Sequence, residues 1–180
     1  MAAIRSSLPG LRATVVVPYL YDDPSEPPQL LGEPGVVAWP QAKGSATAKP
    51  LAFEPVPFDH PLWILYSSGT TGLPKSIVHS HGGILLEHLK SLALHLDLGP
   101  GDRFFWYTTT GWMMWNFLVS GLTVGATVVL YDGSPGYPNL GGLWGLAAQA
   151  QVTYFGTSAP YIQSLMKAGM TPAEGRDLSA

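Results

Sequence analysis

From residue 61 onward, short apolar segments typical of β-strands alternate with longer segments of helical periodicity. This alternation predicts βαβ crossovers, and therefore an α/β fold with a mainly parallel sheet flanked by helices. Gly and Pro residues separate most of the segments. The expected strands are residues 62–66, 76–79, 103–107, 126–131 and 152–155, and the expected helices lie between 80 and 99 and at 113–124, 140–150 and 158–169.

The first of these helices has the clearest boundaries. Ser80 is a candidate N-cap, and Gly99-Pro100 ends the pattern. Between them, leucines recur at helical spacing and predict one apolar face. The last helix has similar punctuation, with Pro160 tolerated in its first turn and Gly169 at its end. The leucines of the first helix are Leu85, Leu89, Leu92 and Leu96.

The first 60 residues are of a different kind. Residues 13–20 form an apolar run that predicts a buried strand, and residues 22–58 are rich in proline. Because proline interrupts helices and cannot pair within a central strand, this second stretch is expected to be a long surface connection. We therefore divide the chain into a buried strand plus Pro-rich segment over residues 1–60 and an α/β subdomain over residues 61–180. The prolines are Pro24, Pro27, Pro28, Pro34, Pro40, Pro50, Pro55 and Pro57.

The composition excludes several classes of protein. Hydrophobic residues make up 46% of the chain and charged residues 12%, so many elements are expected to be buried on both faces. The nine Lys and Arg are scattered, which argues against a nucleic-acid partner. Cysteine is absent, which excludes disulfides and thiolate zinc sites and is compatible with a cytoplasmic location. No segment is long enough to predict a membrane span.

One loop concentrates hydroxyls, glycines and a lysine between two expected strands. Glycines allow backbone N–H groups to converge on an anion, and hydroxyls can donate to phosphate oxygens. A lysine adds a compact positive charge. The sequence therefore predicts a site for a polyphosphate. Its residues are Ser67, Ser68, Gly69, Thr70, Thr71, Gly72 and Lys75.

Two alternative interpretations of this loop exist. A Walker loop needs four residues between its glycines and a helix after its lysine, whereas Gly69 and Gly72 are three apart and Lys75 precedes a strand-like segment. A P-loop phosphoryl-transfer enzyme is therefore disfavoured. The second alternative is a polar hairpin tip, because Ser, Thr, Gly and Pro are ordinary turn residues.

The whole string from Tyr66 to Lys75 resembles the phosphate-binding signature of the superfamily of AMP-forming acyl-CoA synthetases, peptide-synthetase adenylation domains and luciferases. Further segments are similar to the acetoacetate-activating branch of that superfamily, and the similarity covers nearly the whole chain. These segments are residues 61–64, 87–90, 107–116 and 129–135.

The resemblance implies an ATP-dependent acid–thiol ligase. In such an enzyme a carboxylate, here acetoacetate, attacks the α-phosphate of Mg²⁺-bound ATP, and CoA then displaces AMP from the acyl-adenylate. The loop would position ATP and stabilise the leaving pyrophosphate. Alternatives are the same chemistry on another short-chain acid, or an inactive remnant that retains only nucleotide binding.

The resemblance also implies a pocket for the acyl group and CoA. In related enzymes the two residues after a matching Gly-Trp line the acyl pocket, which assigns that role to Met113 and Met114. Trp112, Trp115 and Asn116 are further candidates for the acyl and CoA channel. Without the resemblance, an apolar helix rich in Trp and Met would be interpreted as core.

The resemblance implies further that this chain corresponds to an internal part of the large N-terminal domain. The adenylation lysine and the metal ligands are expected outside this chain, and the rest of the enzyme is expected to pack on it. Adenylation of an ionised acid needs no general base, so the histidines are predicted to be structural or solvent-facing, and residues 156–160 to be a capped helix start. These histidines are His79, His81, His88 and His95.

Overall fold

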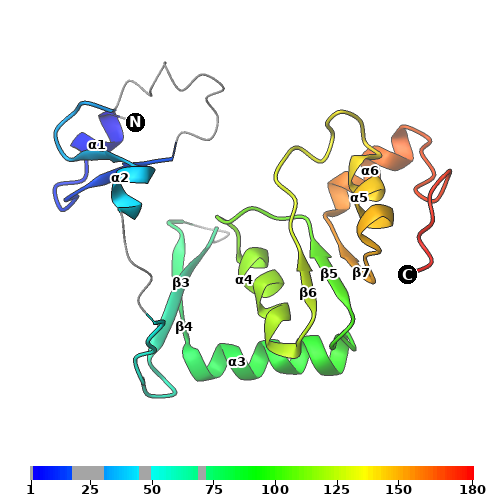
Figure 1. Ribbon diagram of the computed structural model, residues 1–180, viewed down its shortest axis with the longest axis horizontal. Helices are drawn as coiled ribbons and strands as arrows, with labels where there is room; N and C mark the ends of the chain where they lie inside the picture. Colours follow the sequence, from blue (N-terminus) through cyan, green and yellow to red (C-terminus); the bar gives the residue numbers. More distant parts are fainter. Residues whose placement is uncertain (1, 18–30, 45–49, 69–71) are drawn as a thin grey trace. The chain divides into compact units, whose positions relative to one another are not determined.

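The structure is a computed structural model that describes residues 2–17, 31–44, 50–68 and 72–180. The chain divides into two compact units, Met1–Glu54 and Pro55–Ala180. Each unit is described by itself. Figure 1 shows their elements in chain order, from blue to red. Of the described helices, none combines the length and apolar character needed to cross a bilayer.

The first unit contains α1 (Ala2–Ser6), β1 (Thr14–Val16), β2 (Val36–Ala38) and α2 (Trp39–Lys43). Strands β1 and β2 pair in parallel. The expectation of a buried strand is wrong, because Val15 is 46% exposed in a sheet of two short strands. The Pro-rich stretch is also less irregular than expected, since it contains β2 and α2. Pro40 fits in the first turn of α2, where its missing N–H costs nothing.

The second unit is built on a parallel sheet in the order β6-β5-β7. Strand β5 (Arg103–Trp106) lies in the centre, with β6 (Thr127–Val129) and β7 (Tyr154–Gly156) on either side. Both neighbours pair with β5 in parallel. The α/β fold with a parallel sheet is therefore confirmed.

Two successive residues of β5 divide the core into two layers. Because neighbouring side chains of a strand point to opposite faces, Phe104 and Phe105 bury their rings on opposite sides of the sheet. Phe104 is fully buried with residues that include Leu92 and Leu118, and Phe105 with residues that include Leu143. Helix α4 (Met113–Val119) covers the first face, and α5 (Gly142–Ala150) and α6 (Ala159–Lys167) cover the second (Figure 1).

The long helix of the first face begins where expected and ends differently. Helix α3 (His81–Leu89) is capped by Ser80, whose hydroxyl accepts from the N–H of Gly83. A π-helical turn follows over Lys90–His95. The expected apolar stripe is only partly buried: Leu92 is inaccessible, whereas Leu85 is 48% exposed. The predicted helix at 113–124 likewise changes, since α4 is followed by a 3₁₀ turn over Ser120–Val124.

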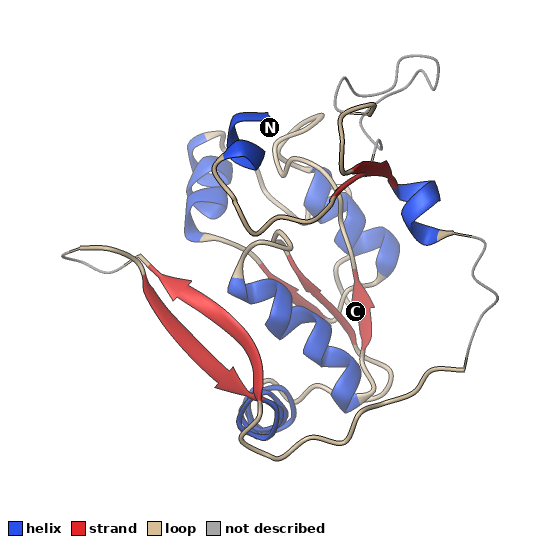
Figure 2. Cartoon of the chain, turned by 90° about the vertical axis from the view of Figure 1, so that its left-hand side faces the viewer, coloured by secondary structure: helices blue, strands red, loops and turns tan. Residues whose placement is uncertain are grey.

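Strands β3 (Pro61–Ser67) and β4 (Lys75–Ser80) form an antiparallel hairpin separate from the parallel sheet. Figure 2 shows the two strands projecting away from the helices, with α3 beginning at the base of the hairpin. The hairpin presents apolar side chains to solvent, including Ile64, which is 53% exposed, and Val78, which is 57% exposed. Its tip carries the loop that the sequence assigns to ATP.

Candidate functional site

The described part of the glycine loop presents free polar groups to solvent. Strand β3 ends at Ser67 and β4 begins at Lys75. Ser67, Ser68, Gly72 and Lys75 are all exposed. Among the described residues, the Ser67 and Ser68 hydroxyls have no hydrogen-bond partner and Lys75 has no ion pair. The remaining predicted residues lie outside the described ranges: Gly69, Thr70 and Thr71.

The hairpin fixes both ends of this loop. Ser67 pairs with Lys75 at the last position of the ladder, and Tyr66 pairs with Ser76. Further down, the indole Nε1–H of Trp63 donates to Nδ1 of His79 at 2.9 Å, across the two strands. This cross-strand bond was not predicted from the sequence, in which Trp63 had no assigned role.

The N-terminus of α3 does not serve as a phosphate site. The N–H of His81 donates to the carbonyl of His60, and that of Gly82 to the carbonyl of Phe58, both at 2.9 Å. The N–H of Gly83, the third at this end of the helix, donates to the hydroxyl of Ser80. A Walker loop would leave such groups for phosphate. Here they are satisfied within the protein, which agrees with the sequence-based argument against a P-loop.

A cavity of about 230 Å³ lies between β3 and the segment that precedes α4. It brings together two segments that the sequence singles out separately, the strand before the glycine loop and the Gly-Trp-Met stretch. Trp112 and Met113 are half-exposed at its wall, and Tyr66 is 71% exposed. The lining residues are Ile64, Leu65, Tyr66, Gly111, Trp112 and Met113.

The other residues predicted for the acyl and CoA pocket do not line this cavity. Trp115 packs against the core around Leu118. The carbonyl of Asn116 accepts from the hydroxyl of Ser120 at 2.8 Å. Met114 is partly buried within α4. The structure thus brings Trp112 and Met113 to the end of β3 and places Trp115 in a packing position.

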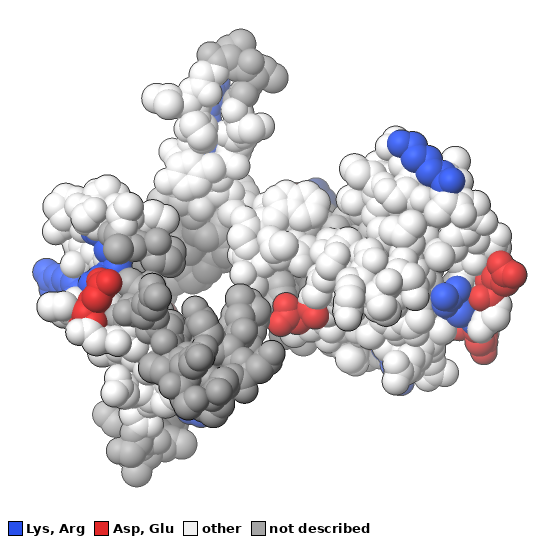
Figure 3. Space-filling model, turned by 90° about the horizontal axis from the view of Figure 1, so that it is seen from above, with Lys and Arg blue, Asp and Glu red and all other residues white. Residues whose placement is uncertain are grey.

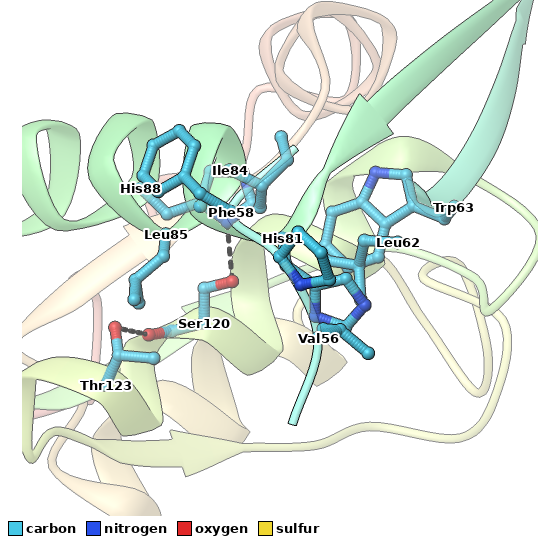
Figure 4. A pocket seen from close by; sticks show the side chains of 12 residues that line it. Val56, Phe58, Leu62, Trp63, His81, Ile84, Leu85, His88, Ser120 and Thr123 are labelled. Atoms are coloured by element: carbon cyan, nitrogen blue, oxygen red, sulfur yellow. Dashed lines mark hydrogen bonds between the residues drawn. The ribbon is translucent and has the colours of Figure 1, made fainter. Parts of the chain in front are cut away.

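A second cavity, of about 420 Å³, lies beside α3. Figure 4 shows its lining side chains, which come from β3 and the segment before it, from α3 and from the 3₁₀ turn. Most are apolar, and none is Lys or Arg. The sequence does not predict this cavity, because its walls are far apart along the chain. The lining residues are Val56, Pro57, Phe58, Leu62, Trp63, His81, Gly82, Ile84, Leu85, His88, Ser120 and Thr123.

The polar groups of this second cavity include two hydroxyls and two imidazoles. Nδ1 of His88 lies 2.5 Å from the hydroxyl of Ser120. That hydroxyl has a single proton, which it donates to the carbonyl of Asn116. A His88 tautomer with the ring proton on Nδ1 satisfies both contacts of this hydroxyl and leaves Nε2 as an acceptor. No Lys or Arg lines the cavity, so it offers an anion no permanently positive side chain.

Two of the four histidines, His79 and His88, have structural roles, as predicted, because each makes a side-chain hydrogen bond within the protein. His79 accepts from Trp63. His88 is 7% exposed, and burial lowers its pKa below the ordinary value of 6.5; Glu87 opposes this shift and His79 adds to it. His81 and His95 are exposed.

Residues elsewhere on the surface offer little further chemistry. Ser158 caps α6 by accepting from the N–H of Tyr161, as expected. Within the described ranges, no group of three or more His, Asp or Glu could hold a metal ion. In the space-filling view of Figure 3, charged side chains are few and do not gather into one patch. The end of the hairpin and the adjoining cavity are therefore the candidate site.

Comparison with known proteins shows the family of this chain. A family described as "AMP-binding enzyme" matches residues 2–180. The chain is 53% identical over 167 residues, or 93% of its length, to acetoacetyl-coenzyme A synthetase of Rhizobium meliloti (strain 1021). It is 43% identical over 179 residues, or 90% of its length, to malonamoyl-CoA synthetase of Penicillium aethiopicum.

A solved structure shows the same fold. Acetoacetyl-CoA synthetase from Streptomyces lividans superposes with a TM-score of 0.83 and 57% identity over 99% of this chain. The chain spans only about a quarter of these proteins: 25% of the R. meliloti protein, 24% of the P. aethiopicum protein and 26% of the S. lividans chain. The family match nevertheless extends over almost every residue, and this chain belongs to the AMP-binding enzyme family.

Proposed function

We propose that this chain is part of an ATP-dependent acid–thiol ligase that activates acetoacetate. The ligase joins acetoacetate to AMP, releases pyrophosphate, and then transfers the acyl group to CoA to give acetoacetyl-CoA. The observation that carries this proposal is the cavity of about 230 Å³ that joins the end of β3 to Trp112 and Met113. This cavity provides space for a small acid directly beside a loop suited to phosphates.

The loop supplies the phosphate end of the site. The hydroxyls of Ser67 and Ser68 and the ammonium group of Lys75 are exposed and without partners among the described residues. They are therefore free to donate to phosphate oxygens. Negative charge develops on the leaving pyrophosphate during adenylation, and donors held in place before the reaction stabilise it. Gly69, Thr70, Thr71 and Gly72 complete this proposed ATP-binding set.

The cavity supplies the acyl end. Trp112 and Met113 give it a flexible, apolar wall that suits a short carbon chain. We keep Met114 as a candidate for the acyl pocket, and Trp115 and Asn116 as candidates for the acyl and CoA channel, although Trp115 packs in the core. The names of the relatives support a short acid carried on CoA.

ATP in such enzymes carries Mg²⁺, but the described residues do not form a metal site. The proposal therefore assigns no metal ligand to this part of the chain. Mg²⁺ would be held by the phosphates of ATP and by residues outside the described ranges. The remainder of the ligase, including its adenylation lysine, would pack on this segment, and the absence of cysteine is compatible with a cytoplasmic enzyme.

The second candidate function is the same ligase chemistry on another short-chain acid, since malonamoyl-CoA synthetase is 43% identical to this chain. Carboxylate-dependent pyrophosphate exchange, measured with the complete gene product, separates the two. The acids to compare are acetoacetate, malonamate, acetate, propionate and butyrate. Acetoacetate should give the highest kcat/KM. A higher value with any other acid would refute the assignment to acetoacetate, and no exchange with any acid would refute the ligase.

A further inference from the structure

The cavity beside the glycine loop has a specific chemical character. None of its six lining residues carries a formal charge, so its walls are suited to the uncharged part of an acid and not to the carboxylate. Two side chains on its walls can donate a hydrogen bond, the phenol of Tyr66 and the indole of Trp112. Among the described residues, neither donor is engaged by another protein group.

We propose that Tyr66 selects acids with a carbonyl at carbon 3, by donating its phenolic hydrogen to that carbonyl oxygen. This inference rests on the proposed function and deepens it, because it assigns substrate choice to a residue of the phosphate-loop strand. A neutral donor suits a ketone or amide oxygen, which is a neutral acceptor. The methyl, methylene or amino groups of the acid then face the apolar wall at Met113.

The position of Tyr66 in β3 supports this role. Residues two apart in a strand share a face, so Ile64 and Tyr66 point to the same side; both line the cavity, as does Leu65 between them. Ser67 follows Tyr66 directly and belongs to the proposed phosphate loop. The strand is fixed by its pairing with β4, in which Tyr66 lies opposite Ser76. One rigid strand would thus hold the acyl end and the phosphate end of the site in register.

The relatives' names agree with this chemistry. Acetoacetyl-CoA synthetase and malonamoyl-CoA synthetase are both similar to this chain, at 53% and 43% identity. The two acyl groups differ in the substituent on carbon 3, which is a methyl group in one and an amino group in the other. They share the carbonyl at carbon 3, which is the group that a Tyr66 hydroxyl would recognise.

The test compares two acids that differ at carbon 3 alone, acetoacetate and butyrate, in pyrophosphate exchange by the complete gene product. Tyr66→Phe removes the donor and keeps the ring. We expect kcat/KM for acetoacetate to fall about threefold to tenfold, the range of one neutral hydrogen bond, with no change for butyrate. The matched control is Tyr137→Phe, which alters a tyrosine that is 75% exposed and does not line the cavity.

An equal loss for both acids would overturn the inference, because it would make Tyr66 a structural support of the loop. Unchanged kinetics with both acids would overturn it as well. Absence of activity in the wild-type protein would instead refute the proposed function. Saturation-transfer NMR with the two acids then decides the role of Tyr66 without turnover. The wild type should bind acetoacetate in preference to butyrate, and Tyr66→Phe should lose this preference. No preference in the wild type, or the same preference in Tyr66→Phe, contradicts the inference.

Discussion

Trp63 and His79 are joined across the hairpin by a hydrogen bond of 2.9 Å, from the indole N–H to Nδ1 of the imidazole. They are also direct partners in the antiparallel ladder, and their rings meet edge to face. The hairpin projects from the helices and buries little apolar surface, so cross-strand pairs of this kind stabilise it. This pair therefore helps to position the loop at the hairpin tip.

We expect Trp63→Phe to weaken the hairpin by about 1 kcal/mol, because it removes one hydrogen bond. Hydrogen exchange measured by mass spectrometry should show faster exchange in β3 and β4. The parallel sheet should be unaffected. The matched control is Trp39→Phe, at a half-exposed tryptophan of α2. Equal exchange rates in the wild type and Trp63→Phe would contradict a role for this bond in holding the hairpin.

Lys75→Ala should slow adenylation about 100-fold or more, because a preorganised donor to the leaving pyrophosphate is lost. The measurement is acetoacetate-dependent pyrophosphate exchange with the complete gene product. Lys90→Ala is the control, since Lys90 is engaged with the exposed carboxylate of Glu87 at 2.6 Å and a surface pair of this kind contributes little. Exchange at the wild-type rate in Lys75→Ala would remove this lysine from the site.

The sequence predicted the parallel sheet well because its signals are local. Punctuation by Gly and Pro marked the ends of the strands, and Ser80 and Ser158 act as the helix caps that were expected. The exposure of Val15 was not predictable from an apolar run, since burial depends on which elements cover a strand. The cavity beside α3 and the bond between Trp63 and His79 depend on tertiary contacts, which leave no periodic signal in the sequence.

The site was predicted only in part, because only some of its features leave a local signal in the sequence. Spacing and composition identified the glycine loop, and the resemblance identified the Gly-Trp-Met segment. Only the folded chain shows that Trp112 and Met113 line one cavity with Tyr66, whereas Trp115 packs against the core. Because α4 is apolar apart from Asn116, its sequence does not tell which of its faces lines a cavity.

Gly82→Ala should destabilise the second unit by about 1–3 kcal/mol, because a new Cβ would lie 2.0 Å from the ring of Phe58. Gly145 is the matched control, since it also lies in a helix and a Cβ there would meet nothing within 4 Å. Gly145→Ala should leave stability unchanged or raise it by up to about 1 kcal/mol. Thermal and urea unfolding of both variants measures the difference. Equal midpoints for the two variants would show that Phe58 does not pack on Gly82.

The buried His88 predicts a pH dependence of stability. Its pKa is lowered in the folded state, chiefly by burial, so below pH 6.5 the unfolded chain takes up a proton that the folded chain does not. The free energy of unfolding should therefore fall as the pH drops below about 6.5, by up to about 1.4 kcal/mol per pH unit from this group. His88→Gln should flatten that slope between pH 7.5 and 5.5. The exposed His95→Gln should keep it, and an unchanged slope in His88→Gln would assign the pH dependence to other groups.

Met113 and Met114 are neighbours with different surroundings, and this difference predicts different effects on acid choice. Met113 lines the cavity beside Tyr66, whereas Met114 does not. Met113→Ala should enlarge the cavity and raise kcat/KM for hexanoate relative to butyrate by about tenfold, since one or two accommodated methylene groups contribute about 1–3 kcal/mol. Met114→Ala should change this ratio less than threefold, a factor that corresponds to a free-energy difference close to the thermal energy at room temperature. The measurement is pyrophosphate exchange with both acids. A larger shift from Met114→Ala than from Met113→Ala would mean that the acyl chain lies against the other side of α4, away from Tyr66.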